Sequence, residues 1–295
     1  MEHETGKTGI VLSSGGGRGV FAHTGFLLAL QQLKIPISAC AGCSAGAIVG
    51  GILASGKDLN QWAEVISQID SRRFWNPDSL WRLAWNFTLR RGRGYTGLSE
   101  HHSAINFLNQ QLGAKTFEEC TIPFSTLAVS LSNGRKKTFS SGDLASTMMA
   151  SAAIPLLYQP VAIGDDLFCD GAVIDLAPTE MICCRHQLDT LIVHHVSQRL
   201  FKHSIRNYFK TRNWALVEIL YRLLYRHHPW YLTDEPIATH QCPCQCGANI
   251  IVLEPSLPEL HWPLIEGGQK IVNSAKQQTT TLLQQTRFAH PPPAS

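Results

Sequence analysis

The chain has little net charge and no long apolar run. Its 25 Lys and Arg residues stand against 22 Asp and Glu residues, and the resulting charge of +3 is too small to indicate nucleic-acid binding. No window approaches the roughly 18 apolar residues of a membrane-spanning helix. The N-terminal stretch has acidic residues where a signal peptide has basic ones. We therefore expect a cytoplasmic protein that binds no nucleic acid and crosses no membrane.

The sequence also lacks a standard metal-binding cysteine pair. Its nine cysteines are an odd number, which argues against a disulfide framework. The stretch "HQCPCQCG" contains His240, Cys242, Cys244 and Cys246, but alternate residues of an extended chain point to opposite sides and no C-x-x-C is present. We interpret this stretch as an accessible thiol loop and predict no metal site.

The chain does have a strand–loop–helix rhythm. Residues 8–14 have the pattern of a strand and 25–33 that of a helix, and 35–56 repeat the arrangement. Further along, the pattern predicts hairpins turning at Asn133–Gly134 and within 161–172, buried strands in "DTLIVHHVS" and "ANIIVLEPS", and a closing helix over 266–285. This order predicts one α/β domain over 8–285, with a central, mostly parallel sheet and helices on both sides. We expect 286–295 to be a disordered tail.

Two segments interrupt this rhythm with mixtures of basic and aromatic residues. We interpret 71–94 and about 199–248 as insertions into the compact core. Within 214–225 the apolar residues share one helical face, and Arg212, Arg222 and Arg226 lie around it. Such a helix either packs on its own domain or lies on an anionic lipid surface. The sequence therefore predicts a peripheral membrane contact in this region.

A serine lies between two glycines in "GCSAG", residues 42–46. A G-x-S-x-G sequence permits a sharp turn from strand to helix, which exposes the serine at the helix N-terminus. Close helix–sheet packing alone also uses such small residues. Ser44 is therefore a candidate nucleophile only if oxyanion-binding and proton-accepting groups accompany it.

The glycine run in "SSGGGRG" follows the first predicted strand. Several backbone N–H groups there can face one oxyanion, as acyl transfer requires, and they can equally cradle a phosphate. The dinucleotide fingerprint would need glycine at Val20, and the Gly-Lys-Ser/Thr of a P-loop is absent. A flexible turn is the remaining alternative.

The candidate base is Asp170, which ends the strand of a predicted hairpin and precedes Gly171 and Ala172. An Asp-Gly pair is usually a turn signal only. A carboxylate of ordinary pKa is also a weak base near neutrality, so desolvation would have to raise the pKa of Asp170. The three fragments gain weight because they occur together and in this order.

Together, "SGGGRG" (14–19), "GCSAG" (42–46) and "DGA" (170–172) resemble the motifs of the patatin-like phospholipase family, over about residues 8–197. The resemblance implies a lipid acyl hydrolase of the phospholipase A or lysophospholipase type that needs no cofactor. It implies Ser44 as nucleophile, Asp170 as base and the N–H groups of Gly15, Gly16 and Gly17 as oxyanion hole. Arg18 would support the glycine loop or contact a lipid head group. Ser14 stands where the family usually has glycine, and the spacing to Gly25 is one residue longer than is common.

Two alternatives remain open from the sequence. One is an α/β-hydrolase with a Ser-Asp-His triad, because His194 and His195 follow Asp170 in the right chain order. Ser44 comes early for that fold, and we expect these histidines to end a strand with ordinary hydrogen bonds. The other is a lipid-binding protein that has the same fold but no activity.

Overall fold

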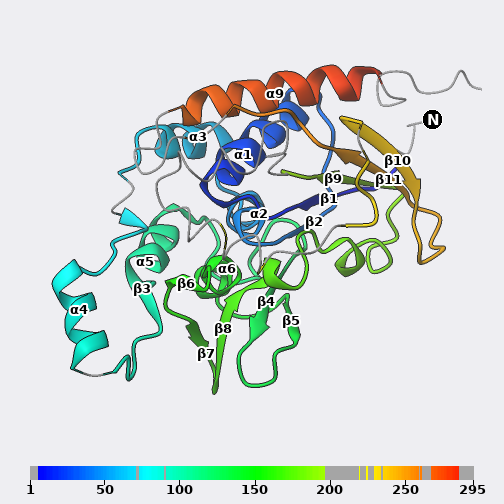
Figure 1. Cartoon of the computed structure of the whole chain (residues 1–295). Coiled ribbons are helices and arrows are strands. Elements are labelled where there is room, and N and C mark those ends of the chain that lie inside the picture. The colour runs from blue at the N-terminus through cyan, green and yellow to red at the C-terminus, as the bar shows by residue number, and fades with distance from the viewer. Residues whose placement is uncertain are drawn as a thin grey trace, which may run out of the picture.

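The computed structural model describes residues 6–70, 73–89, 91–196, 219, 224, 229–233, 235–258, 260 and 267–285. In this part of the chain, nine strands form one sheet in the order β10-β11-β9-β1-β2-β4-β8-β7, with β5 also paired to β4 (Figure 1). The strands are β1 (Thr8–Leu12), β2 (Ala39–Gly42), β4 (Phe124–Ser130), β5 (Lys136–Phe139), β7 (Val161–Ile163), β8 (Asp166–Asp170), β9 (Thr190–His194), β10 (Ile237–Gln241) and β11 (Asn249–Leu253).

The centre of the sheet is parallel and its margins are antiparallel. Strands β11, β9, β1, β2 and β4 run in one direction, whereas β10, β5, β8 and β7 join through antiparallel pairs. The predicted mostly parallel sheet is therefore confirmed. The predicted hairpins are also present, as β4–β5 and β7–β8.

Helices cover one face of this sheet. They are α1 (Gly16–Gln32), α2 (Ala45–Ala54), α3 (Leu59–Ser67), α5 (His102–Gln111), α6 (Leu144–Ala152) and α9 (Gly268–Gln285). Successive side chains of a strand point to opposite faces, so Ile10 and Leu12 of β1 lie in the core under these helices and Val11 lies in the core of the other face. Figure 1 shows α9 running along α1 on the outside of this layer.

The opposite face has a thinner cover in the described part of the chain. Two short 3₁₀ turns, η2 (Gly171–Val173) and η3 (Thr179–Met181), lie along it with the segment that follows them. Met181, Ile182 and Leu188 from this segment pack with Val11 and Val193 of the sheet. The two faces thus hold separate apolar cores.

Strand β4 brings β2 and β8 end to end. Strand β5 occupies one edge of β4 from Thr126 to Val129, so β2 and β8 must both pair with its other edge. Strand β2 ends with Gly42 opposite Thr126, and β8 ends with Asp170 opposite Ala128. The residues that follow Gly42 therefore emerge beside Asp170, although 126 positions separate Ser44 from Asp170 in the chain.

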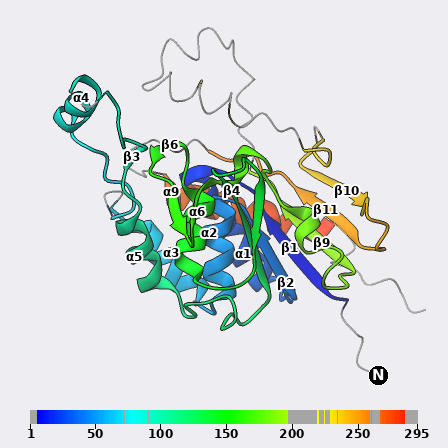
Figure 2. The ribbon, with the colours of Figure 1, turned by 90° about the horizontal axis from the view of Figure 1, so that it is seen from below.

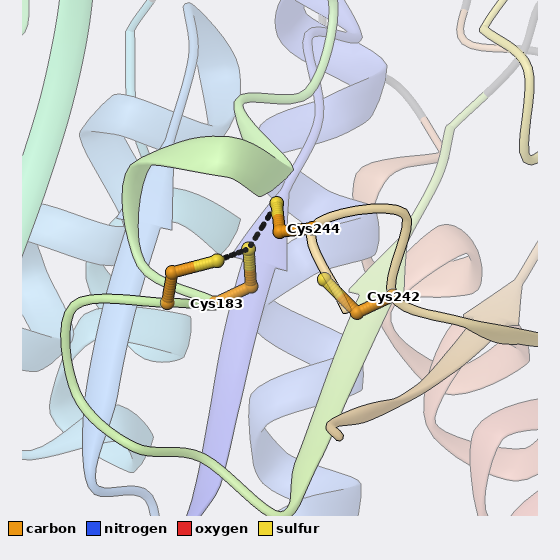
Figure 3. A group of neighbouring side chains, drawn as sticks. Cys183, Cys242 and Cys244 are labelled. Atoms are coloured by element: carbon orange, nitrogen blue, oxygen red, sulfur yellow. Dashed lines mark hydrogen bonds between the residues drawn. The ribbon is translucent and has the colours of Figure 1, made fainter. Parts of the chain in front are cut away.

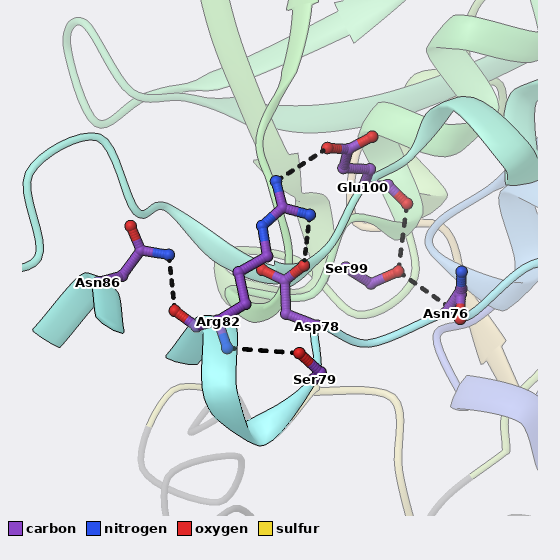
Figure 4. Close-up of polar contacts among 7 residues, drawn as sticks. All are labelled: Asn76, Asp78, Ser79, Arg82, Asn86, Ser99 and Glu100. Carbon is purple, nitrogen blue, oxygen red and sulfur yellow. Dashed lines mark hydrogen bonds and ion pairs between the residues drawn. The ribbon is translucent and has the colours of Figure 1, made fainter. Parts of the chain in front are cut away.

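The first insertion contains a helix that stands away from the sheet. Figures 1 and 2 both show α4 (Leu80–Thr88, cyan) at the margin of the molecule. The Ser79 hydroxyl accepts a hydrogen bond from the backbone N–H of Arg82 and caps the helix, and the Arg82 guanidinium pairs with Asp78 at 2.9 Å (Figure 4). Its base is joined to the domain by β3 (Gly97–Ser99), which pairs in parallel with β6 (Leu156–Tyr158).

Of the second predicted insertion, 199–248, the structure describes residues 219, 224, 229–233 and 235–248. Arg212, Arg222 and Arg226, on which the predicted membrane contact rests, lie outside the described residues, as does the predicted tail 286–295. Among the helices that the structure describes, none combines the length and apolar character needed to span a bilayer.

Candidate active site

Ser44 lies at a sharp turn between β2 and α2. Its backbone has φ 55° and ψ −117°, in the left-handed half of the map that few residues other than glycine adopt. A Cβ on residue 42 would stand 2.2 Å from the Gly46 carbonyl oxygen, and one on residue 46 would stand 2.1 Å from that of Leu12. Both contacts are impossible, so the two glycines are required by this turn and not only by helix–sheet packing.

The Ser44 side chain meets Asp170 directly. Its hydroxyl donates a hydrogen bond of 2.8 Å to Oδ2 of Asp170, while Oδ1 accepts one of 2.8 Å from the backbone N–H of Ala172. Ser44 is 3% exposed and Asp170 is fully buried. The carboxylate is thus fixed by one oxygen and offers the other to the serine.

The adjacent thiol does not compete with this serine. Cys43 is buried, and desolvation, followed by the charges of Asp170 and Asp175, raises the pKa of its thiol well above the ordinary value. A thiol attacks only as thiolate. Cys43 therefore stays protonated, which leaves Ser44 as the candidate nucleophile at this turn.

A small polar network holds the turn from behind. The Ser44 N–H donates to the Ser151 hydroxyl at 3.0 Å, and the Thr126 hydroxyl bridges Ser151 and the carbonyl oxygen of Gly42. Thr126 and Ser151 are both buried. Nothing in the sequence pattern marks these two residues, because Thr and Ser are common in strands and helices and their partners in the serine turn, Gly42 and Ser44, lie more than 80 positions away.

The glycine run lies at the N-terminus of α1. The predicted helix began at Gly25, but α1 begins at Gly16, so the later glycines form its first turns. The sequence pattern did not indicate this start because glycine has a low helix propensity. The first N–H groups of a helix have no intrahelical acceptor, and those of Gly15, Gly16 and Gly17 meet no acceptor elsewhere in the described chain. Ser13, just before this run, contacts the serine turn, because its carbonyl oxygen accepts a hydrogen bond from the Gly46 N–H.

Arg18 ties the glycine loop to a distant segment. Its Nη2 donates a hydrogen bond of 2.6 Å to the carbonyl oxygen of Leu257, in the chain between β11 and α9. The side chain therefore anchors the start of α1 through a backbone carbonyl, one of the two roles expected for it. The spacing of the sequence could not identify Leu257 as the partner.

The histidines of the alternative triad lie elsewhere. His194 ends β9, but its Nδ1 pairs with Nδ1 of His23 at 2.8 Å and its ring stacks on Phe26. His195 pairs with the Tyr231 hydroxyl at 3.3 Å. The Ser44–Asp170 contact leaves no histidine between the two groups, so the structure does not form the triad.

Comparisons with known proteins identify the family of this chain. Residues 10–182 match the family model of the patatin-like phospholipases, which is more than half of the chain. The chain belongs to the patatin-like phospholipase family. The match includes the glycine run, the serine turn and Asp170, the three fragments on which the resemblance was based.

Curated relatives of this patatin-like domain are longer proteins. An uncharacterised NTE family protein of Mycobacterium tuberculosis is 28% identical over 174 residues, which cover 58% of this chain and 44% of the relative. A lysophospholipase of Cryptococcus neoformans is also 28% identical over 174 residues, covering 59% of this chain and 10% of the fungal protein. The chain thus spans less than half of either relative.

Solved structures show the same fold at low identity. VipD of Legionella pneumophila matches 95% of this chain and 67% of its own, with a TM-score of 0.54 and 15% identity. The human GIVD cytosolic phospholipase A2 matches 98% of this chain and 62% of its own, with a TM-score of 0.54 and 10% identity. These matches establish a mixed, mostly parallel sheet flanked by helices as the fold of this chain.

Proposed function

We propose that this chain is a serine esterase that hydrolyses acyl esters of lipids, with Ser44 as nucleophile and Asp170 as general base. The observation that carries the proposal is the 2.8 Å hydrogen bond from Ser44 Oγ to Asp170 Oδ2 in a buried site. A carboxylate that accepts the nucleophile's own proton can activate it without a histidine. One patatin-like domain over 8–285 would contain the whole site.

The reaction follows from these contacts. Ser44 Oγ attacks the ester carbonyl as its proton passes to Asp170 Oδ2, and the resulting tetrahedral intermediate expels the alcohol, which takes that proton. A water molecule then gives its proton to Asp170 and attacks the acyl-serine ester. Collapse of the second intermediate releases the fatty acid and returns the proton to Ser44 Oγ.

The glycine loop supplies the electrostatic part of the catalysis. In both intermediates the carbonyl oxygen becomes an oxyanion, and the N–H groups of Gly15, Gly16 and Gly17 at the start of α1 are the donors for it. The α1 N-terminus adds a favourable dipole. Arg18 serves this step by holding the loop through Leu257 O.

The substrate class rests on the relatives and on the surface of the domain. The fungal relative is named a lysophospholipase and the human structural neighbour a phospholipase A2. We assign to this chain the chemistry that both share, hydrolysis of an acyl ester in a phospholipid or lysophospholipid. Head group, acyl length and position on the glycerol are left to the assay.

A membrane surface is the partner that such a substrate requires, and α4 is suited to it. Trp81 and Trp85 of this helix are 87% and 62% exposed, and Leu89 at its end is 63% exposed. Residues at i, i+4 and i+8 lie on one helical face, so the three side chains form one apolar stripe. Aromatic side chains beside arginine are typical of helices that rest in a lipid head-group layer.

The experiment compares hydrolysis of a lysophospholipid and of a soluble short-chain ester by variants of the purified protein. We expect Ser44→Ala and Asp170→Asn each to lower turnover of both substrates by at least about 1,000-fold, as is usual when a nucleophile or its base is removed. The matched controls are Ser67→Ala on α3 and Asp166→Asn at the start of β8, which should retain activity. Wild-type protein that binds lipid but hydrolyses neither substrate would indicate a non-catalytic lipid-binding protein instead.

A further inference from the structure

Four cysteines from two distant segments come together at one edge of the sheet. Cys183 and Cys184 follow η3, and Cys242 and Cys244 lie in the loop that joins β10 to β11. One sulfur atom from each residue lies within 4.8 Å of the other three. Figure 3 shows Cys183 on one segment with Cys242 and Cys244 on the loop that packs against it.

The loop between β10 and β11 is folded so that the side chains of Cys242 and Cys244 lie close to the same point. The N–H of Cys242 donates to Ala248 O, and the N–H of Gln245 donates to Cys242 O, which closes the loop tightly. Gln245 and Gly247 have φ of 57° and 86°, and these two left-handed residues turn the chain back toward β11. Cys242 and Cys244 therefore do not point to opposite sides, as they would in an extended chain.

Two of the sulfur separations are close to the edge length of a zinc–thiolate tetrahedron, and all lie within 4.8 Å. Cys183 Sγ lies 3.4 Å from Cys184 Sγ and 3.7 Å from Cys244 Sγ. Four thiolates held about 2.3 Å from one zinc ion are about 3.8 Å apart. Iron–sulfur clusters place inorganic atoms between their ligands and hold them more widely. The spacing thus favours a single ion over a cluster.

We propose that Cys183, Cys184, Cys242 and Cys244 bind one Zn²⁺ ion. Four soft thiolate donors in tetrahedral arrangement are the ligand set that this ion prefers in structural sites. Cys183 and Cys242 are buried in the core beneath the sheet, while Cys184 and Cys244 are exposed. Two ligands are thereby held in place by packing, and two face the solvent from which the ion enters.

The other candidate ligands of this loop have different partners. His240 Nε2 pairs with Tyr231 O at 2.9 Å, and its ring contacts that of Trp230. Cys246 Sγ lies 3.9 Å from Cys183 O and its thiol also contacts that of Cys184, but it is not one of the four thiols that all lie within 4.8 Å of one another. Cys246 is therefore a matched control within the same loop.

The position of the site indicates a structural role. Asn249, just after the cysteine loop, pairs with Thr190 at the start of β9, whereas the serine turn lies beyond the other end of the strands, where Leu253 pairs with His194. These two ends of the strands are about 13 Å apart, because each strand is five residues long. An ion here would clamp the β10–β11 hairpin to the 182–188 segment and take no part in ester hydrolysis.

The test measures metal content, cobalt spectra and melting temperature of the full chain purified under reducing conditions. We expect about one zinc per chain and, after cobalt replacement, the visible absorption of tetrahedral cobalt thiolate. Exposed Cys244→Ser should lose both, and Cys246→Ser should keep both. A zinc chelator should lower the melting temperature of wild type and of Cys246→Ser but leave Cys244→Ser unchanged.

Three results would overturn the proposal. One is wild-type protein that stays without stoichiometric zinc after reconstitution. Another is Cys244→Ser protein that retains the ion and the cobalt spectrum. The third is mass spectrometry that finds the four cysteines joined as disulfides under the conditions in which the thiols should bind zinc.

Discussion

At the scale of single residues, a buried pair of histidines links the glycine loop to the sheet. His23 Nε2 lies 2.8 Å from the Ser13 carbonyl oxygen, which can only accept, so Nε2 carries the proton and Nδ1 accepts from His194 Nδ1. The same Ser13 oxygen accepts from the Gly46 N–H. Burial lowers the pKa of both rings, so both are neutral near pH 7, and this chain of hydrogen bonds joins His194, His23 and Ser13.

This pair predicts a specific loss of stability in acid. Burial lowers the pKa of His23 from 6.5 to about 3 and holds that of His194 well below its usual range. On acidification the unfolded chain takes up these protons at a higher pH than the folded chain does. The free energy of unfolding therefore has its full value above about pH 6.5 and decreases as the pH falls toward 3. Between pH 6.5 and 5 the loss is about 2 kcal/mol for His23 alone.

The measurement is urea unfolding of wild type and His23→Gln at several pH values. Glutamine keeps a side-chain N–H for Ser13 but loses the imidazole that pairs with His194, so the variant should be less stable than wild type at pH 7.5. Because glutamine cannot be protonated, the variant lacks the acid-dependent loss that His23 causes in wild type. That difference should shrink by about 2 kcal/mol on going to pH 5. A difference that stays constant over this range would show that His23 does not titrate on unfolding.

At the scale of elements, α4 exposes Trp81 and Trp85 and is the helix that we propose to contact a membrane surface. Replacing Trp81 and Trp85 together by Gln removes most of its apolar stripe without touching the Ser79 cap or the Arg82–Asp78 pair. We expect at least about 10-fold weaker binding to anionic phospholipid vesicles, because each indole inserted in the head-group layer contributes on the order of 1 kcal/mol or more. Vesicle sedimentation measures this.

The control for α4 is a second pair of exposed apolar residues. Leu131 and Leu167 are 50% and 44% exposed and belong to the β4–β8 region. Leu131→Gln with Leu167→Gln should bind vesicles like wild type, and both double variants should hydrolyse a soluble short-chain ester normally. Equal loss of vesicle binding in the two would make general hydrophobicity, not α4, responsible.

The sequence indicated the elements well where local chemistry determines them. The pattern of residues 42–46 predicts the strand–helix turn, because both glycines are sterically required there. Asn133–Gly134 likewise predicts the β4–β5 hairpin. The cysteine loop shows the opposite case. Judged by its internal spacing it had no metal geometry, because two of the four gathered thiols lie about 60 positions earlier in the chain.

At the scale of the whole molecule, topology makes the proposed dyad from two distant motifs. Ser44 and Asp170 could each be selected from sequence, but their contact depends on β2 and β8 meeting end to end along β4. Which distant strands pair depends on all the strand edges that are available in the sheet. No local sequence pattern indicates this pairing. Supporting residues such as Ser151 and Thr126 belong to the same class, since they become visible only when the strands are assembled.

The central claim, that Ser44 is a nucleophile activated by Asp170, is tested most directly by a fluorophosphonate probe followed by peptide mass spectrometry. The probe forms a stable phosphonate ester only with an activated serine and requires no knowledge of the natural substrate. We predict one label per folded chain, on the peptide that contains Ser44, with no label in Ser44→Ala and little in Asp170→Asn. Unlabelled wild type, a label on another serine or full labelling of Asp170→Asn would contradict the account.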